Sequence, residues 1–316
     1  MASRFFCRES SGIVLKRMIY DYAIDPSLVA SWSTLSQFRY FIEKFGLGTN
    51  RIVSVVPKKN WKRLAFESFK GSVIEYKRLE ELINTLTETS TKRGGNSYDG
   101  TKAWFENIEA ENRRRAFGSI LTAHTIDSER DNKDSAWNAD TTVCVSRMAD
   151  GITKCVAPML KLADNIMLVD PYFSPMRPQY KSTLLSFLHA ALNDRSQEHP
   201  LRFEVHTSGS RDNACASCYF EADCLRVLPA LIPVGQSVRV VRWLERKLGE
   251  KFHNRYVLTN FGGVSFGTGL DEGSIGQTDD VMLLGRNAFL QRFNQFSTDN
   301  GAFDLELDVL VSGCRR

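Results

Sequence analysis

No stretch of this 316-residue sequence approaches the roughly 20 consecutive apolar residues that a membrane-spanning helix needs. The N-terminal segment Met1–Ile13 also has no apolar run of the signal-peptide kind, because Arg4, Arg8 and Glu9 interrupt it. We therefore expect a cytoplasmic protein without membrane insertion. A lipid substrate is disfavoured as well, since no amphipathic membrane-binding segment or anchor is visible.

Cysteines are few, and they do not form a metal-binding pattern. The chain has seven, most of them within apolar segments, which is typical of reduced thiols. Cys215 and Cys218 form one CxxC with Cys224 downstream, but no second CxxC follows, and a zinc site needs four ligands. We therefore expect no metal and no other cofactor. The formal net charge of +4 permits nucleic-acid binding without arguing for it.

The N-terminal part, residues 1–135, has the pattern of a mostly helical domain of unknown role. Asp25-Pro26 is a helix-start signature, and Val73–Leu86 repeats apolar residues at helical spacing. A further helix is expected over Trp104–Leu121, and one short β-rich run lies at Arg51–Val56. The charged segment Asp127–Asp134 has the composition of a linker, so we place the domain boundary close to it.

The C-terminal part, residues 136–316, alternates between strand and helix patterns. Ile166–Val169 is a continuous apolar run, as expected of a strand buried on both faces, and it ends at the turn Asp170-Pro171. The other expected elements are strands at Arg202–His206, Val238–Trp243, Tyr256–Thr259 and Gly263–Gly267, and helices at Val145–Leu162, Leu184–Leu192 and Cys218–Leu228. This alternation predicts an α/β fold, with a sheet flanked by helices.

One segment of the C-terminal part combines a histidine, a basic residue and a glycine turn at defined spacing. Its members are His253, Arg255, Asn260, Gly267, Thr268 and Asp271. The spacing resembles the signature His-x-Lys-x4-Asp-x6-Gly-Ser-x2-Asn of the phospholipase D superfamily. The histidine and the first glycine are retained, whereas arginine, asparagine, threonine and aspartate replace the lysine, aspartate, serine and asparagine. The resemblance covers roughly Val145 to the C-terminus and implies a phospholipase D-like sheet.

The resemblance also implies a chemistry for these residues. The imidazole of His253 would attack phosphorus and form a covalent phospho-histidine. Arg255, two residues on, would face the same side of the strand and clamp the phosphate with two hydrogen bonds. Thr268, beside Gly267, could donate its hydroxyl to a phosphate oxygen, and Asp271 could orient an imidazole. Asn260 cannot supply the negative charge of the family aspartate.

The family site uses two such motifs, and this chain contains one. His206 is the best second histidine within the chain, because it ends a strand, where α/β sheets place ligands. A single motif otherwise indicates a two-fold homodimer that supplies one His253 from each copy. Asp170 also ends a strand and is a binding candidate. Structural alternatives remain open, since His253 could be a packed turn residue and Asp170 could cap the turn before Pro171.

Two functions from different classes follow. The first is a metal-independent phosphodiesterase that acts on nucleic acid through His253. The second is a catalytically inactive module that binds a phosphate-bearing ligand, nucleic acid or a partner protein within a larger complex. The retained spacing favours the first, while Arg255, Asn260 and the missing second motif favour the second. Either is compatible with a subunit of a prokaryotic defence or mobile-element system.

Overall fold

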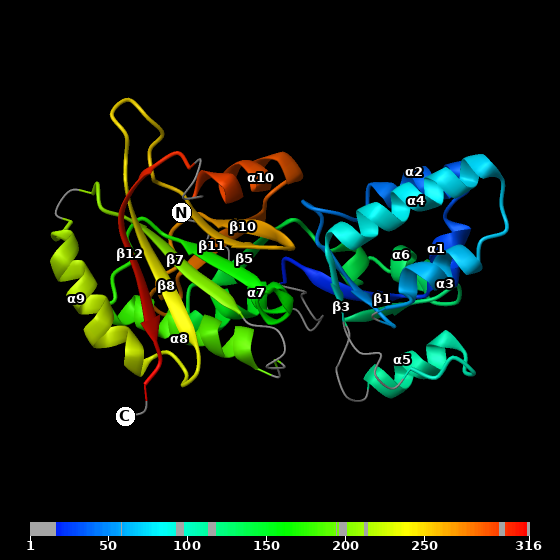
Figure 1. Cartoon of the computed structure of the whole chain (residues 1–316), viewed down its shortest axis with the longest axis horizontal. Coiled ribbons are helices and arrows are strands. Elements are labelled where there is room, and N and C mark those ends of the chain that lie inside the picture. Colours follow the sequence, from blue (N-terminus) through cyan, green and yellow to red (C-terminus); the bar gives the residue numbers. More distant parts are fainter. Residues whose placement is uncertain are drawn as a thin grey trace, which may run out of the picture.

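The computed structural model describes residues 17–57, 59–92, 98–112, 118–193, 195, 201–211, 214–296 and 301–314. Within these ranges the chain is mixed α/β, with two sheets of four and eight strands. Figure 1 shows two groups of elements side by side, each built around one sheet. No helix in these ranges is both long and apolar enough to cross a membrane.

The N-terminal unit is built on a parallel sheet, ordered β3-β2-β1-β4. Its strands are β1 (Tyr20–Ile24), β2 (Arg51–Val55), β3 (Ser90–Lys92) and β4 (Ser119–Leu121). Every residue of β1 and β2 is buried, as expected of strands covered on both faces. The helices are α1 (Pro26–Ser31), α2 (Leu35–Ile42), α3 (Trp61–Glu67), α4 (Val73–Glu88), α5 (Trp104–Asn112) and α6 (Ile126–Asp131).

This unit has more helix than strand, as the sequence predicted, but the parallel sheet at its centre was foreseen only at β2. Asp25 caps α1 as expected, and its carboxylate accepts the backbone N–H of Ser27. The expected helix Trp104–Leu121 is present as α5 up to Asn112, but its end is wrong, because Ser119–Leu121 form β4; residues 113–117 lie outside the described residues. The expected linker Asp127–Asp134 instead contains most of α6.

The boundary between the two units lies a few residues beyond that segment. Trp137 belongs to a short 3-10 helix, Ala136–Asn138, and packs in the N-terminal core against Tyr22 and Phe41. The next strand, β5 (Thr142–Ser146), already belongs to the second sheet. The two units are in contact. For example, the backbone N–H of Met18 donates to the carbonyl of Cys155 in α7 (Ala149–Leu162) over 3.0 Å.

The C-terminal unit is an eight-stranded sheet, ordered β12-β8-β7-β6-β9-β10-β11-β5. The parallel strands β6 (Asn165–Val169), β7 (Arg202–Ser208) and β8 (Ser237–Leu244) lie on one side of the sheet. Antiparallel partners extend it on both sides: β9 (Arg255–Thr259), β10 (Gly262–Phe266), β11 (Thr278–Leu283) and β12 (Asp304–Ser312). The predicted strands Ile166–Val169, Arg202–His206, Val238–Trp243 and Tyr256–Thr259 are therefore present.

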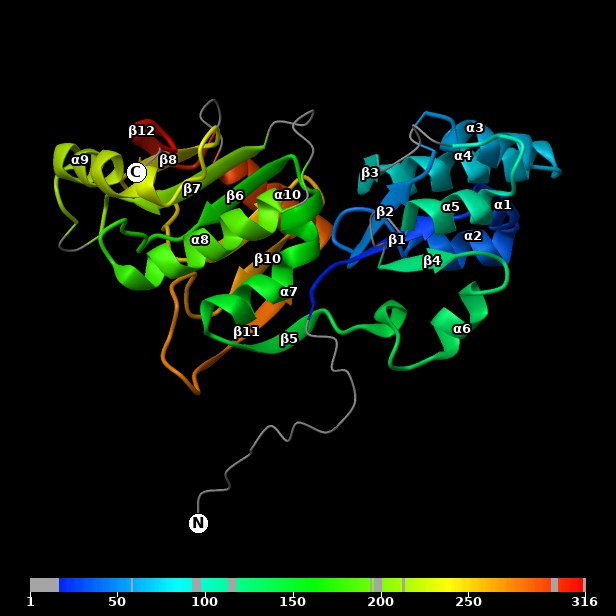
Figure 2. The same ribbon diagram turned by 90° about the horizontal axis from the view of Figure 1, so that it is seen from below.

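Helices cover both faces of this sheet (Figure 2). One face carries α7 (Ala149–Leu162), α8 (Pro178–Leu192) and α9 (Ser217–Val227) over a core that includes Leu168, Val205 and Val257. The other face carries α10 (Arg286–Gln295) over Val169, Trp243 and Tyr256. In β6, β8 and β9, successive residues point alternately into these two cores. The position of a residue in its strand therefore determines which face of the sheet its side chain covers.

Candidate functional site

The topology of the second sheet brings several chain segments to one edge. The C-terminal ends of β6, β7 and β8 share this edge because these strands are parallel. β9 is antiparallel to β6, so its start, with His253 and Arg255, lies there too. β10, β11 and β5 are antiparallel to their neighbours, so the end of β10, the start of β11 and the end of β5 lie at this edge as well. Thr268 and Asp271 follow β10 and Arg147 follows β5, which places them here. We call it the His253 edge. The carboxyl ends of parallel strands are where α/β sheets bind ligands.

Arg255 is the first residue of β9, and His253 lies two residues before it at the same edge of the sheet. His253 is exposed and makes no hydrogen bond to any residue that the structure describes. Arg255 is half-buried, and its guanidinium carbon lies 5.0 Å from the centre of the Tyr172 ring. Its Nε is buried, and within the described ranges it has no hydrogen-bond partner. Both side chains are therefore available to a ligand.

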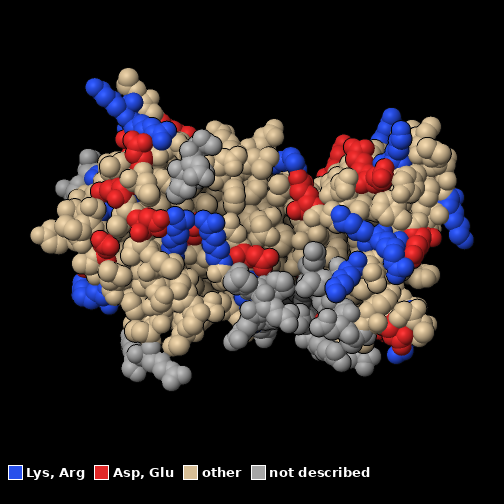
Figure 3. Space-filling model, in the orientation of Figure 1, with Lys and Arg blue, Asp and Glu red and all other residues tan. Residues whose placement is uncertain are grey.

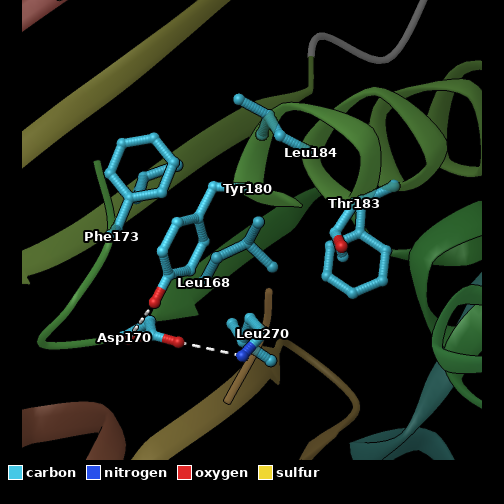
Figure 4. Close-up of a pocket in the computed structure, with 9 residues that line it drawn as sticks. Leu168, Asp170, Phe173, Tyr180, Thr183, Leu184 and Leu270 are labelled. Carbon is cyan, nitrogen blue, oxygen red and sulfur yellow. Dashed lines mark hydrogen bonds between the residues drawn. The ribbon is translucent and has the colours of Figure 1, made fainter. Parts of the chain in front are cut away.

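Asp170 anchors this edge from below. Its carboxylate, on a residue that is 2% exposed, accepts the backbone N–H groups of Tyr172 and Leu270, each over 2.8 Å. The Tyr180 hydroxyl donates to it over 3.2 Å, as Figure 4 shows. Burial raises the pKa of Asp170, although the two backbone N–H groups and nearby Arg255 oppose the rise. Asp170 thus holds the turn after β6 against the loop after β10.

The cavity beside Asp170 is too small for a substrate. It measures about 20 Å³, enough for roughly one water molecule, and its lining is mostly apolar (Figure 4). The lining residues are Leu168, Asp170, Phe173, Tyr180, Thr183, Leu184, Phe187, Val205 and Leu270. A ligand of this site would therefore lie on the open edge above Asp170.

Asp271 has a partner other than an imidazole. Nη2 of Arg147, a residue that follows β5, donates to the Asp271 carboxylate over 2.6 Å and to its carbonyl over 3.0 Å. Gly269 makes this approach possible, because a Cβ there would lie 2.5 Å from Oδ1 of Asp271. The ion pair fixes the loop after β10 and neutralises the Asp271 carboxylate.

Thr268 and Gly267 are likewise held by the protein itself. The Asp279 carboxylate accepts both the backbone N–H and the hydroxyl of Thr268, the latter over 3.2 Å. A Cβ at Gly267 would approach the same carboxylate to 2.9 Å. The hydroxyl that could have bound phosphate is thus engaged in fixing the turn.

Asn260 lies at the far end of β9 from His253. It comes five positions after Arg255 along the chain, which corresponds to about 16 Å of extended strand. Its side-chain oxygen accepts the backbone N–H groups of Asp164, just before β6, and of Asn165, the first residue of β6, over 3.0 and 3.4 Å. The structure therefore gives Asn260 a role in fixing the β9–β10 turn and separates it from the other motif residues.

His206 is buried in the core and does not reach the edge. Trp243 donates its indole N–H to Nδ1 of His206 over 2.9 Å, so Nε2 carries the proton and faces Glu204 at 3.3 Å. Burial lowers the pKa of His206, which keeps the imidazole neutral at neutral pH. Burial opposes ionisation of Glu204, but hydrogen bonds from His206, Arg202 and Arg239 lower its pKa to about 2.

Acid is expected to destabilise the fold through this pair. Glu204 has a depressed pKa, so its contribution is present above the unfolded-state value and is lost as the pH falls toward about 2. His206 acts in the same direction, because only the unfolded chain takes up a proton below about pH 6.5. Glu204→Gln should therefore cost about 2–3 kcal/mol of unfolding free energy at neutral pH and flatten the acid limb of the stability curve.

Urea unfolding at a series of pH values measures both effects. Glu67→Gln is the matched control, since Glu67 pairs only with Arg63 on an exposed helix face and should change little. An acid limb of unchanged slope in Glu204→Gln would show that this network does not set the pH dependence.

The described residues offer neither a second histidine at the His253 edge nor a metal-binding group. His124 is exposed in the N-terminal unit, His189 lies on α8, and His199 is outside the described residues. Among the described residues, no three His, Cys, Asp or Glu side chains are placed to hold a metal ion. Cys215 and Cys218 are exposed free thiols, and Cys224 is buried.

A larger hollow of about 440 Å³ lies in the N-terminal unit, between α1, α2 and α6. It adjoins the segments that leave β1 and β4, where the strand order reverses, a place at which α/β sheets often bind ligands. Its charged groups and the hydroxyl of Ser31 already have partners. Ser31 donates to the carbonyl of Leu28, and Arg130 pairs with Asp127 and Asp131.

Three residues of the His253 edge were missed from the sequence: Arg147, Arg211 and Asp279. Each lies close to a strand end: Arg147 directly follows β5, Arg211 comes three residues after β7, and Asp279 is the second residue of β11. The available signal was a charged residue beside each strand end, but two of these strands were not predicted. Arg211 follows the predicted strand Arg202–His206 and could have been found.

Charge on the face drawn in Figure 3 is interspersed, with acidic side chains beside most of the basic ones. No continuous basic track crosses that face, which agrees with the small net charge of the chain. Anion binding on that face would therefore depend on local groups of basic residues.

Comparisons with known proteins add little. No protein-family model and no curated protein matches the chain. Solved structures that resemble it include TrmBL2, an archaeal chromatin protein whose structure shows a novel mode of DNA binding. The identity is 10%, the match covers 72% of this chain and 82% of that one, and the TM-score is 0.26. A likeness this weak carries no argument about fold or function.

Proposed function

We propose that the C-terminal unit binds phosphodiester groups of nucleic acid at the His253 edge and cleaves them without a metal ion. The observation that carries this proposal is the convergence of His253 and Arg255 with the ends of β6 and β7, where neither side chain makes a hydrogen bond to the described residues. Arg147, Asp170 and Asp271 hold each other or the turns around the site, which leaves Arg255 to meet an anion.

The proposed reaction has two steps. A nitrogen of neutral His253 attacks phosphorus, so that a P–N bond forms while the P–O bond to the leaving group breaks. Arg255 donates to the phosphoryl oxygens, where negative charge builds up. Water then attacks the phospho-histidine, which releases the phosphate monoester and restores the imidazole.

The leaving oxygen needs a proton, and no second histidine of the described chain lies at this edge. We propose that His253 of a second copy supplies it, in a two-fold dimer. Purified protein should then self-associate, and sedimentation would measure it.

A binding-only role is the second candidate, and a specific observation favours it. Thr268 is held by Asp279 and Asn260 lies at the opposite end of β9, so two motif positions serve the fold alone. Such a module would hold the phosphate of a nucleic acid or of another partner without cleaving it, as a subunit of a larger complex.

Cleavage is expected to survive chelation, because the proposed groups are an imidazole and a guanidinium. The measurement is the initial rate on labelled single- and double-stranded DNA, on RNA and on a chromogenic phosphodiester, with and without EDTA. Equal rates within about twofold would support the proposal. A requirement for magnesium would place the chemistry at another site, and binding without any cleavage would favour the second candidate.

A further inference from the structure

Two arginines, one beside each of the strands that flank β6, lie near the ring of Tyr172. Tyr172 follows β6, while Arg211 follows β7 and Arg255 begins β9, and β7 and β9 flank β6 in the sheet. The guanidinium carbons lie 5.1 Å (Arg211) and 5.0 Å (Arg255) from the centre of the Tyr172 ring. Tyr172 itself is 39% exposed, so this group opens to solvent. A cation over a tyrosine ring is attracted by the negative face of the ring, which restricts where each guanidinium lies.

Neither guanidinium is neutralised by a hydrogen-bonded carboxylate. The Nε atoms of Arg211 and Arg255 are both buried, and in the described part of the chain neither has a hydrogen-bond partner. The nearby carboxylates are engaged elsewhere, since Asp170 accepts three donors of its own and Asp271 pairs with Arg147. Burial lowers the pKa of Arg211, and the charges of Arg177 and Arg242 contribute in the same direction, whereas Tyr180 and the Asp170 charge oppose the shift.

Such an arrangement is unfavourable without an anion. Burying an ionised group that lacks a partner costs free energy, and two like charges at one ring repel each other. A phosphate group removes both costs, because each guanidinium can donate two parallel hydrogen bonds to its oxygens. The unsatisfied donors and the shared ring thus point to one anionic ligand between the two arginines.

We infer that Arg211, Tyr172 and Arg255 form a clamp for a single phosphodiester group of the nucleic-acid backbone, supplied entirely by one chain. The inference rests on the proposed function and extends it by assigning the second cation to Arg211, outside the motif. The ligand is recognised by its phosphate, so binding is independent of base sequence and sensitive to salt. A second copy of the chain is then needed for proton donation and not for binding.

The test is binding of fluorescein-labelled oligothymidylate, followed by fluorescence anisotropy over a series of salt concentrations. Arg211→Ala should weaken binding about tenfold or more and lower the slope of log affinity against log salt by about one. Arg211→Lys keeps the charge but loses the paired donors, so it should weaken binding less and leave the slope near wild type. Tyr172→Leu should weaken binding several-fold, and inorganic phosphate should compete better with wild type than with Arg211→Ala.

Lys154→Ala is the matched control, because Lys154 is an exposed cation on α7 that pairs only with Asp150. It removes the same charge and should leave affinity and salt slope unchanged. If Arg211→Ala does not fold, as circular dichroism would reveal, Arg211→Lys and the phosphate competition decide.

The outcomes separate the clamp from the function on which it rests. Wild-type affinity and slope in both Arg211 variants, with loss in Arg255→Ala, would overturn the clamp and leave the proposed function standing. Unchanged binding in Arg211→Ala and Arg255→Ala alike, or no binding by wild type, would overturn both.

Discussion

His253→Ala is expected to abolish phosphodiester cleavage, lowering the rate at least about a thousandfold, while oligonucleotide binding stays near wild type. The side chain is exposed and makes no hydrogen bond to the described residues, so its removal should not disturb the fold. Its loss removes the nucleophile and, in a dimer, the proton donor as well. Binding persists because the proposed phosphate contacts come from arginines.

Initial rates on a chromogenic phosphodiester and on labelled nucleic acid measure the loss, and anisotropy measures binding on the same samples. His124→Ala is the matched control, since His124 is an exposed histidine of the N-terminal unit. Cleavage that survives in His253→Ala would place the nucleophile elsewhere. Arg255→Ala should lose both cleavage and binding, whereas Arg255→Lys, which restores the residue of the family that the motif resembles, should keep most of both.

Strands buried on both faces were predictable, because their apolar runs are unbroken. Ile166–Val169 is such a run, and the structure has β6 there. β4, with only three residues, could not be separated from the end of a helical pattern. The second and third residues of β11 are Asp279 and Asp280, so apolar periodicity does not reveal this strand. Asp279 is buried because it accepts two donors from Thr268, a tertiary contact that the local sequence does not encode.

Other misses had a signal in the sequence. β12 alternates Leu305, Leu307, Val309 and Val311 with residues that are polar except for Leu310, which is close to the pattern of a half-buried strand. β1 contains Asp21, a residue that argues against a buried strand, yet its carboxylate accepts the backbone N–H of Gly118 and the hydroxyl of Ser54. A buried acid is tolerated when its partners are in place, and those partners come from β2 and the start of β4.

The site shows the same limit more sharply. Residue spacing predicted that His253 and Arg255 lie on one strand, but β9 begins at Arg255, and His253 lies in the segment just before it. The same spacing also included Asn260, which lies at the other end of that strand. Arg211 joins them only through the order β7-β6-β9, and sheet order is a tertiary property that no local pattern reveals.

Asp170→Ala is expected to lower the free energy of unfolding by about 3–5 kcal/mol and to abolish activity at the His253 edge. The buried carboxylate accepts two backbone N–H groups and the Tyr180 hydroxyl, and alanine leaves all three donors without a partner. Tyr172 and the loop at Leu270 would then lose their common anchor.

Asp170→Asn separates hydrogen bonding from charge. Burial raises the pKa of Asp170, so the folded chain holds this proton more tightly than the unfolded chain does. Its contribution therefore favours folding at low pH and is lost as the pH rises through the folded-state value. Asparagine keeps one acceptor oxygen without a charge to bury, so it should cost less than alanine and remove this pH dependence. Urea unfolding of the three proteins from about pH 4 to about pH 8 measures both differences. The two variants could lower the free energy of unfolding equally, and wild type could show the same dependence of that free energy on pH as both. Asp170 would then be a space-filling residue that does not hold the two turns together.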